Sequence, residues 1–196
     1  MQENAAHRLA QAALETWSHI HQAVTEGKAA DVVLQTWWRD HRLYGSRDRR
    51  FMAEAIFSTF RWKGWLEPLN LTPAAALGIA YLLDAKDPHL SADILLKQGN
   101  GPSSLAPAGS LTVNEKANWL AAAFPANAPP DRLDLVPGWF RSVIAEDPIP
   151  SFIASIQTRP PTWLRARSGE VEAACALLTA DGGKHRRGSR VPEPIA

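Results

Sequence analysis

"TPAAALGIAYLLD", residues 72–84, is the stretch that decides the fold. Thr72 offers a capping hydroxyl and Pro73 suits the first position of a helix, so the stretch predicts a helix that begins at residue 73. Nearly every residue that follows, up to Leu83, is apolar, so this helix has no polar face to turn toward water. We therefore predict that it forms the buried centre of a helical bundle.

Further helices are predicted on both sides of this centre, because apolar residues recur there at helical spacing. None of the first 125 residues shows the two-residue alternation of a strand, so this part is predicted to be all-helical. The expected segments are residues 4–25, 32–42 with Asp31 as cap, 46–63 with Ser46 as cap and Gly64 as terminus, 92–98 after Ser91, and a helix opened by a capping box of Thr112 and Glu115.

A boundary between two domains is predicted at "PANAPPD", residues 125–131, because prolines cluster there. We assign residues 1–127 to an all-helical domain and residues 128–196 to a small, incomplete α/β segment, so the fold class is mainly α. The expected elements of that segment are two short helices within residues 138–147 and 151–157, a strand at Trp163, Leu164 and Arg165, a helix capped by Ser168, and a basic tail without periodicity.

Several classes of function lack their residues in this sequence. The six histidines do not pair at metal-ligand spacing, and a single cysteine cannot build a thiolate site, so we expect neither a metal nor a cofactor. Cys175 lies among apolar helix residues, which favours an inert buried thiol over a nucleophile. No nucleophile elbow or phosphate loop is present, so we expect no enzyme activity from this chain. The start shows no secretory pattern, and no apolar run has the length of a membrane span, so we expect a cytoplasmic protein without membrane contact.

Basic residues gather in two parts of the chain. Between Arg39 and Lys63, seven arginines and lysines stand against three acidic residues, and residues 184–190 add four more with no acid. Such islands suit an anionic partner such as RNA. The alternative is a solvated helix face whose arginines pair with carboxylates such as Asp40, Glu54 and Glu67. The eight tryptophans, Trp62 and Trp65 among them, are expected mostly in the core, with one or two free to stack on a ligand.

A resemblance to a known family sharpens this choice. "YGSRDRRFMAEAIFSTFRWKGWL", residues 44–66, resembles the third helix of the NusB-like domain that precedes the catalytic domain of RsmB/Sun (Fmu)-type RNA 5-methylcytosine methyltransferases. "AALGIAYLL", residues 75–83, is similar to the next helix of that family, and residues 136–167 resemble its segment before the catalytic domain. The residues that match the third-helix motif are Arg47, Asp48, Arg50, Phe51, Glu54, Phe57 and Arg61.

The resemblance implies a non-catalytic RNA-binding module, with ribosomal RNA as its first candidate ligand. The alternative is a NusB-like protein-interaction module in transcription antitermination, and a methyltransferase domain or another protein is a further candidate partner. We expect Arg49 or Asp48 to have a structural role, while Arg47, Arg50 and Arg61 line one exposed stripe. The candidate RNA-binding residues are Arg47, Arg49, Arg50, Phe57, Arg61, Lys63, Arg165 and Arg167.

The sequence also departs from the family. Arg167 stands where the family has asparagine, and the helix after residue 90 is remodelled. The S-adenosylmethionine-binding turn and the two catalytic cysteine motifs of the family have no counterpart, and Cys175 lies in neither motif. The resemblance therefore implies binding without methyl transfer.

Overall fold

The chain consists of two compact units, residues 1–158 and 159–196, and each is described by itself. The computed structural model describes residues 2–143, 149–158, 164, 166–167 and 169–182. The segment at 125–131, where the sequence predicts a boundary, lies within the first unit. The helical elements of the first unit are α1 (Gln2–Thr25), α2 (Ala30–Asp40), α3 (Ser46–Arg61), α4 (Lys63–Leu66), η1 (Glu67–Leu69), α5 (Pro73–Asp84), α6 (Leu90–Gln98), α7 (Val113–Ala123), η2 (Arg132–Leu135), α8 (Gly138–Val143) and α9 (Ile149–Ile156).

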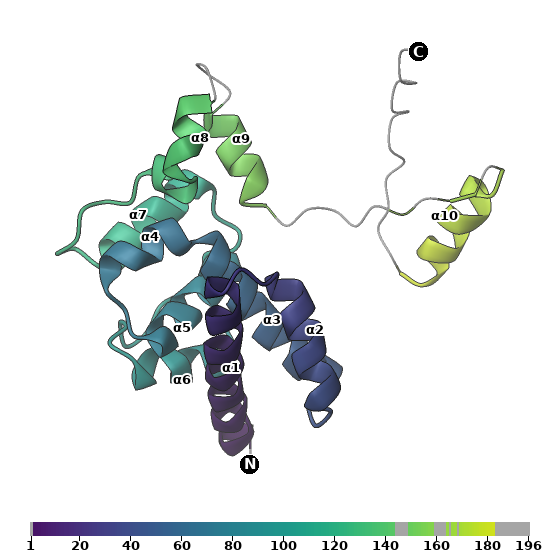
Figure 1. Cartoon of the computed structure of the whole chain (residues 1–196), viewed down its shortest axis with the longest axis horizontal. Coiled ribbons are helices and arrows are strands. Elements are labelled where there is room, and N and C mark those ends of the chain that lie inside the picture. The colour runs from purple at the N-terminus through teal and green to yellow at the C-terminus, as the bar shows by residue number, and fades with distance from the viewer. Residues whose placement is uncertain (1, 144–148, 159–163, 165, 168, 183–196) are drawn as a thin grey trace. The chain divides into compact units, whose positions relative to one another are not determined.

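Helix α5 is the buried centre of the first unit, as the sequence predicts. Figure 1 shows it beside α6. Nine of its 12 residues are buried, and it packs against α3 on one side and α6 on another. Gly78 allows the close approach of α6, because a β-carbon there would lie 3.0 Å from the carbonyl oxygen of Ala92. The apolar stretch therefore forms a core helix, and its neighbours cover it from several directions.

Helices α1, α2 and α3 complete the bundle. Helix α1 contacts α2, α3 and α6. The apolar face expected of α3 is confirmed, since Phe51, Met52, Ala55 and Ile56 are all buried. On the opposite face Arg47 and Arg50 are exposed, whereas Phe57 and Arg61 are half-buried.

Two predicted caps are confirmed and three are wrong. The Thr72 hydroxyl accepts a hydrogen bond from the Ala75 N–H, and Thr112 with Glu115 forms the complete capping box. The other caps belong to the preceding residues: α2 follows Ala29 rather than Asp31, α3 follows Gly45 rather than Ser46, and α6 follows His89 rather than Ser91. The His89 ring replaces the expected hydroxyl, because its Nδ1 accepts the Ser91 N–H at 3.2 Å.

The predicted single helix over residues 46–63 is interrupted at Trp62. Helix α3 ends at Arg61, and α4 begins at Lys63. Gly64, expected as a helix terminus, lies inside α4. It is required there because a β-carbon would collide with the backbone carbonyl of Asp134, next to which α4 packs on η2.

The second unit contains one described helix, α10 (Val171–Ala180), which begins after Glu170. No residue of α10 is buried, and Cys175 is half-buried, so the expectation of a buried thiol is wrong. The predicted strand is not found in the described residues: Leu164 has no regular structure, and Trp163 and Arg165 lie outside them. Ser168, the predicted cap, and residues 183–196 also lie outside the described residues.

The regular elements in the described part of the chain are all helices, and none of them is a strand. Within this part, none of the helices combines the length and the apolar character needed to cross a membrane.

Candidate nucleic-acid interface

Exposed arginines surround the loop between α2 and α3. Arg39 lies in the last turn of α2, Arg42 in the loop, and Arg47 and Arg50 in the first turns of α3; all four are exposed. We call these four arginines the basic corner. Within the described residues, none of the four forms an ion pair with a carboxylate. Their guanidinium groups are therefore available to an anion from outside the molecule.

The loop of the basic corner is held in place by contacts at both ends. His41 stacks on Trp37 with ring centroids 3.7 Å apart, and its Nδ1 lies 2.9 Å from the Trp37 carbonyl oxygen. At the other end, Tyr44 is half-buried and packs against the core. Between these anchors the Arg42 Nε donates to the carbonyl oxygen of Arg39 at 3.3 Å. The arginines thus project from a fixed turn.

Arg49 differs from its arginine neighbours. Its side chain is half-buried, and its guanidinium carbon lies 5.9 Å from the centre of the Trp38 ring, within reach of a cation–π contact. The Arg49 Nε is buried without a hydrogen-bond partner in the described structure, as are the indole nitrogens of Trp37 and Trp38. This agrees with the structural role expected for Arg49, which joins α2 to α3.

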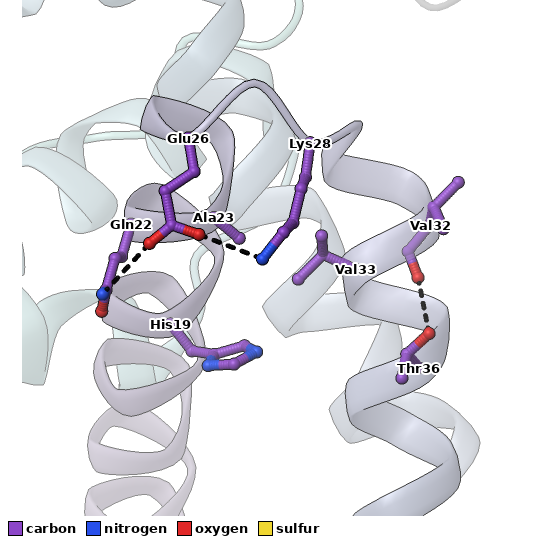
Figure 2. Close-up of a pocket in the computed structure, with 8 residues that line it drawn as sticks. All are labelled: His19, Gln22, Ala23, Glu26, Lys28, Val32, Val33 and Thr36. Carbon is purple, nitrogen blue, oxygen red and sulfur yellow. Dashed lines mark hydrogen bonds and ion pairs between the residues drawn. The ribbon is translucent and has the colours of Figure 1, made fainter.

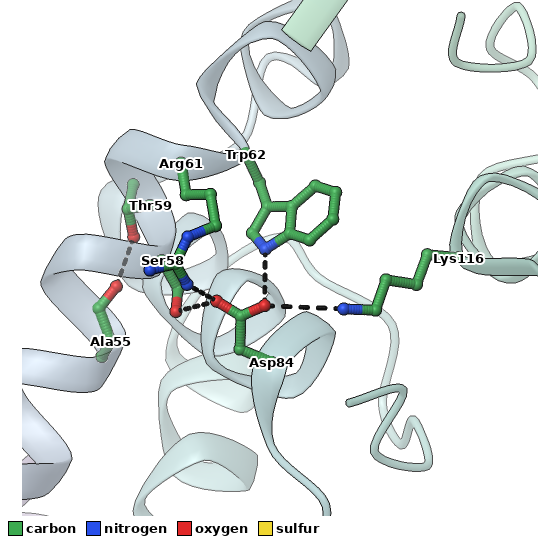
Figure 3. Close-up of polar contacts among 7 residues, drawn as sticks. All are labelled: Ala55, Ser58, Thr59, Arg61, Trp62, Asp84 and Lys116. Carbon is green, nitrogen blue, oxygen red and sulfur yellow. Dashed lines mark hydrogen bonds and ion pairs between the residues drawn. The ribbon is translucent and has the colours of Figure 1, made fainter. Parts of the chain in front are cut away.

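Arg61, at the other end of α3, is bound inside the protein (Figure 3). Its guanidinium forms an ion pair with Asp84 at the end of α5, and only 23% of its side chain is exposed. The expectation that Arg61 is an exposed member of the arginine stripe is therefore wrong. Helical spacing puts Arg61 on the same face of α3 as Arg47 and Arg50, but a carboxylate from α5 reaches that face.

The Asp84 carboxylate accepts from four side chains, which we call the Asp84 hub. Ser58 Oγ donates to Oδ2 at 2.6 Å, next to the Arg61 contact. The Trp62 indole N–H donates to Oδ1 at 3.0 Å, and the Lys116 ammonium lies 3.5 Å from the same oxygen. The hub therefore joins the end of α3, the end of α5 and helix α7 (Figure 3).

The Lys116 ammonium is the most buried charge of the hub. Only 8% of its side chain is exposed, and it lies 4.7 Å above the Trp62 ring. Burial lowers the pKa of Lys116, while the Asp84 carboxylate opposes this shift. The ammonium is thus held by its two partners, and the hub is a means of fixing helices rather than an open site.

The remaining predicted binding residues fall into separate places. Phe57 is half-buried against the core. Lys63 is exposed, and its Nζ lies 3.4 Å from Oε1 of Glu67. This ion pair fits the alternative prediction, in which basic residues on a solvated helix face pair with carboxylates such as Glu67. Arg167 is exposed in the second unit, and Arg165 lies outside the described residues. Two of the predicted binding residues, Arg47 and Arg50, thus belong to the basic corner. Its other two members, Arg39 and Arg42, were not predicted as binding residues.

Trp62 and Trp65 are core residues, as expected of most tryptophans here. Both are buried, and the Trp65 indole donates to the carbonyl oxygen of Asp131 at 2.6 Å. They offer no stacking surface to a ligand.

An open pocket lies between the end of α1 and the start of α2, with a volume of about 460 Å³ (Figure 2). Its charged groups bond to one another: Glu26 accepts from Lys28 at 3.0 Å and from Gln22 at 3.4 Å. Figure 2 shows Val32 and Val33 on the facing helix. Because Glu26 and Lys28 already pair with each other and are largely exposed, the pocket presents no convergent set of ligands.

In the described residues, no group of three or more histidine, cysteine or acidic side chains could hold a metal ion.

Some of the features above were missed from the sequence. Arg39 and Arg42 were counted in the basic island but were not predicted as site residues. The signal that could have identified them is their position only a few residues before the helix predicted to begin after Gly45. Asp84 could have been identified as a candidate partner for a basic residue, because it is the one acidic residue of an otherwise apolar helix and lies at its end.

No protein-family model, no curated protein and no solved structure matches this chain. The resemblance to the NusB-like region of RNA methyltransferases therefore stays a prediction.

Proposed function

We propose that the chain binds RNA through the basic corner. The observation that carries the proposal is the exposure of Arg39, Arg42, Arg47 and Arg50 on and beside one anchored turn, with no carboxylate ion pair to any of them in the described residues. Exposed arginines that form no ion pair in the described residues can each contact a phosphate, and several such contacts add up to appreciable affinity for RNA.

Arginine is well suited to such a contact. Its planar guanidinium donates to phosphate in a fixed fork and remains charged at all physiological pH values. The start of α3 adds the partial positive charge of its unpaired N–H groups, at the end where Arg47 and Arg50 lie. Both contributions favour a polyanion over a neutral ligand.

The proposal is limited to binding, with ribosomal RNA as the first candidate because of the family resemblance of residues 44–66. In that family the NusB-like region accompanies a catalytic domain, so we propose that this chain holds RNA for chemistry carried out elsewhere.

The test replaces Arg47 and Arg50 together with alanine and measures the affinity for a structured ribosomal RNA fragment over a range of salt concentrations. We expect weaker binding and a salt dependence (log K against log salt) that is flatter by about one to two units, because two phosphate contacts are lost. A double Lys86→Ala/Lys97→Ala variant removes the same charge from exposed positions elsewhere and serves as the matched control.

The stability of the arginine variant should change by no more than about 0.5 kcal/mol, because both side chains are exposed and form no ion pair with the part of the chain that the structure describes. If both double variants lose affinity equally, binding reflects overall charge and the basic corner is not the site. If neither variant loses affinity, the proposal of RNA binding at this surface is wrong.

A protein-interaction module is the second candidate, and one observation favours it. Trp139, Phe152 and Ile156 of α8 and α9 expose 66%, 37% and 41% of their surface, and Phe140 stacks on Phe152 at 5.1 Å. Exposed aromatic groups of this kind are typical of protein interfaces. This candidate predicts a partner whose binding is lost on Trp139→Ala and is insensitive to the arginine replacements.

A further inference from the structure

Leu43 is the most exposed large apolar residue of the described chain, at 96%. It lies in the loop between Arg42 and Tyr44, in the middle of the basic corner. Leaving a leucine side chain in water forgoes the gain of burying it, and that gain becomes available when an apolar partner covers the residue.

The anchors of the loop prevent Leu43 from folding back. On one side His41 is stacked on Trp37, and on the other Tyr44 is packed against the core. Only Arg42 and Leu43 lie between these anchors, so the leucine stays on the surface of the turn, next to Arg42 and four residues before Arg47 in the sequence. An apolar group is thereby presented on the loop that joins the arginine-bearing ends of α2 and α3.

We propose that Leu43 contacts an unstacked base, so that the basic corner recognises RNA with an unpaired nucleotide in preference to a regular duplex. This inference rests on the RNA binding proposed above and adds the class of RNA. The arginines would hold the phosphates on either side of the nucleotide, and Leu43 would pack on the face of its base.

The geometry of RNA explains the preference. In an A-form helix the bases are stacked inside, the major groove is too narrow for side chains, and the shallow minor groove presents polar hydroxyls. A leucine finds an apolar surface only where a base is turned out of the stack, as in a bulge or a loop. On a regular duplex the same leucine would meet only polar groups and would gain little.

The experiment compares two RNA hairpins of the same stem sequence, one with an unpaired nucleotide in the stem and one without. The full chain should bind the bulged hairpin more tightly. Leu43→Ala should lower the affinity for the bulged hairpin by about tenfold, since roughly two methylene equivalents of burial are lost, and should leave the affinity for the regular hairpin unchanged. Leu43→Met, which keeps an apolar side chain of similar volume, should retain the preference.

Val32→Ala is the matched control, because Val32 is also exposed, at 58%, but lies near the opposite end of α2. It should bind both hairpins as the unmodified chain does. Equal affinity of Leu43→Ala and the unmodified chain for the bulged hairpin would overturn the inference, as would an equal loss for both hairpins.

Two further outcomes separate this inference from its premise and from a rival ligand. If the Arg47/Arg50 variant loses affinity for both hairpins while Leu43→Ala loses none, RNA binding stands and the role of Leu43 is refuted. If the chain binds vesicles containing phosphatidylserine through Leu43, while Leu43→Ala leaves RNA binding intact, the leucine serves a lipid surface instead and the inference is overturned.

Discussion

Replacing Asp84 with alanine is the sharpest test of how this bundle is held together. The carboxylate receives Ser58, Arg61, Trp62 and Lys116, so one substitution removes the shared acceptor of four donors. Arg61 keeps 23% of its side chain exposed and regains some contact with water. Only 8% of the Lys116 side chain is exposed, so its ammonium cannot regain contact with water in the same way.

The expected loss follows from the group that is left behind. Removing one partner of a buried ion pair costs about 3–5 kcal/mol, because the other charge stays buried without compensation. For a chain of this size that loss corresponds to a melting temperature lower by about 6–20 °C, at roughly 2–4 °C per kcal/mol. Asp84 is partly buried and its partners are close, so we expect the effect to lie within this range.

Urea unfolding followed by tryptophan fluorescence gives the free energy of unfolding directly. Asp87→Ala is the matched control: it removes an exposed carboxylate three residues away and should change the free energy by no more than about 0.5 kcal/mol. The double variant Asp84→Ala/Lys116→Met should recover part of the loss, since no ammonium is then left buried. A loss below about 1 kcal/mol for Asp84→Ala, or no recovery in the double variant, would refute this account of the hub.

Two further predictions concern other contacts of the first unit. Burial holds the pKa of His89 below its usual value, although the carboxylates of Asp48, Asp93 and Glu54 oppose this shift. As the pH falls, the unfolded chain therefore binds a proton at this histidine before the folded chain does. The free energy of unfolding should consequently fall as the pH drops below about 6.5 and become constant below the pKa of the folded state. His89→Asn keeps a cap acceptor and should remove this part of the pH dependence in unfolding curves measured across that range; an unchanged dependence would exclude His89 as its source. Gly64→Ala should destabilise the unit by more than about 1 kcal/mol in the same assay, because its β-carbon collides with backbone at Asp134, and a neutral result would show that α4 and η2 separate easily.

The fold was largely predictable because its signals are local. The apolar run of α5, the hydroxyl and proline at its start, and the capping box of α7 all act within a few residues. The wrong caps of α2, α3 and α6 show the limit of this reasoning. At each of these starts a serine or aspartate was available, but the chain entered the helix one or two residues earlier, and at α6 a histidine ring took the role of the hydroxyl.

The candidate site was predictable only in part, because an arginine's partner can come from any part of the chain. The sequence placed Arg47, Arg50 and Arg61 on one face of α3. It could not show that Asp84, 23 residues beyond Arg61, would lie against the end of that face. Likewise, the exposure of Leu43 depends on anchors from α2 and from the core, which no local pattern reports.

The two ends of α3 therefore have different physical roles, although the same residue type occupies both. At its start, Arg47 and Arg50 have no internal counter-charge in the described residues, so their replacement should alter binding and leave stability unchanged. At its end, Arg61 is already neutralised by Asp84, so changes there should alter stability first. Arg47 and Arg61 are separated by fourteen helical residues, roughly 21 Å, which is beyond the distance at which mutational effects ordinarily couple. Binding and stability can therefore be measured as independent properties of one helix, and a variant that changed both would indicate that α3 moves as RNA binds.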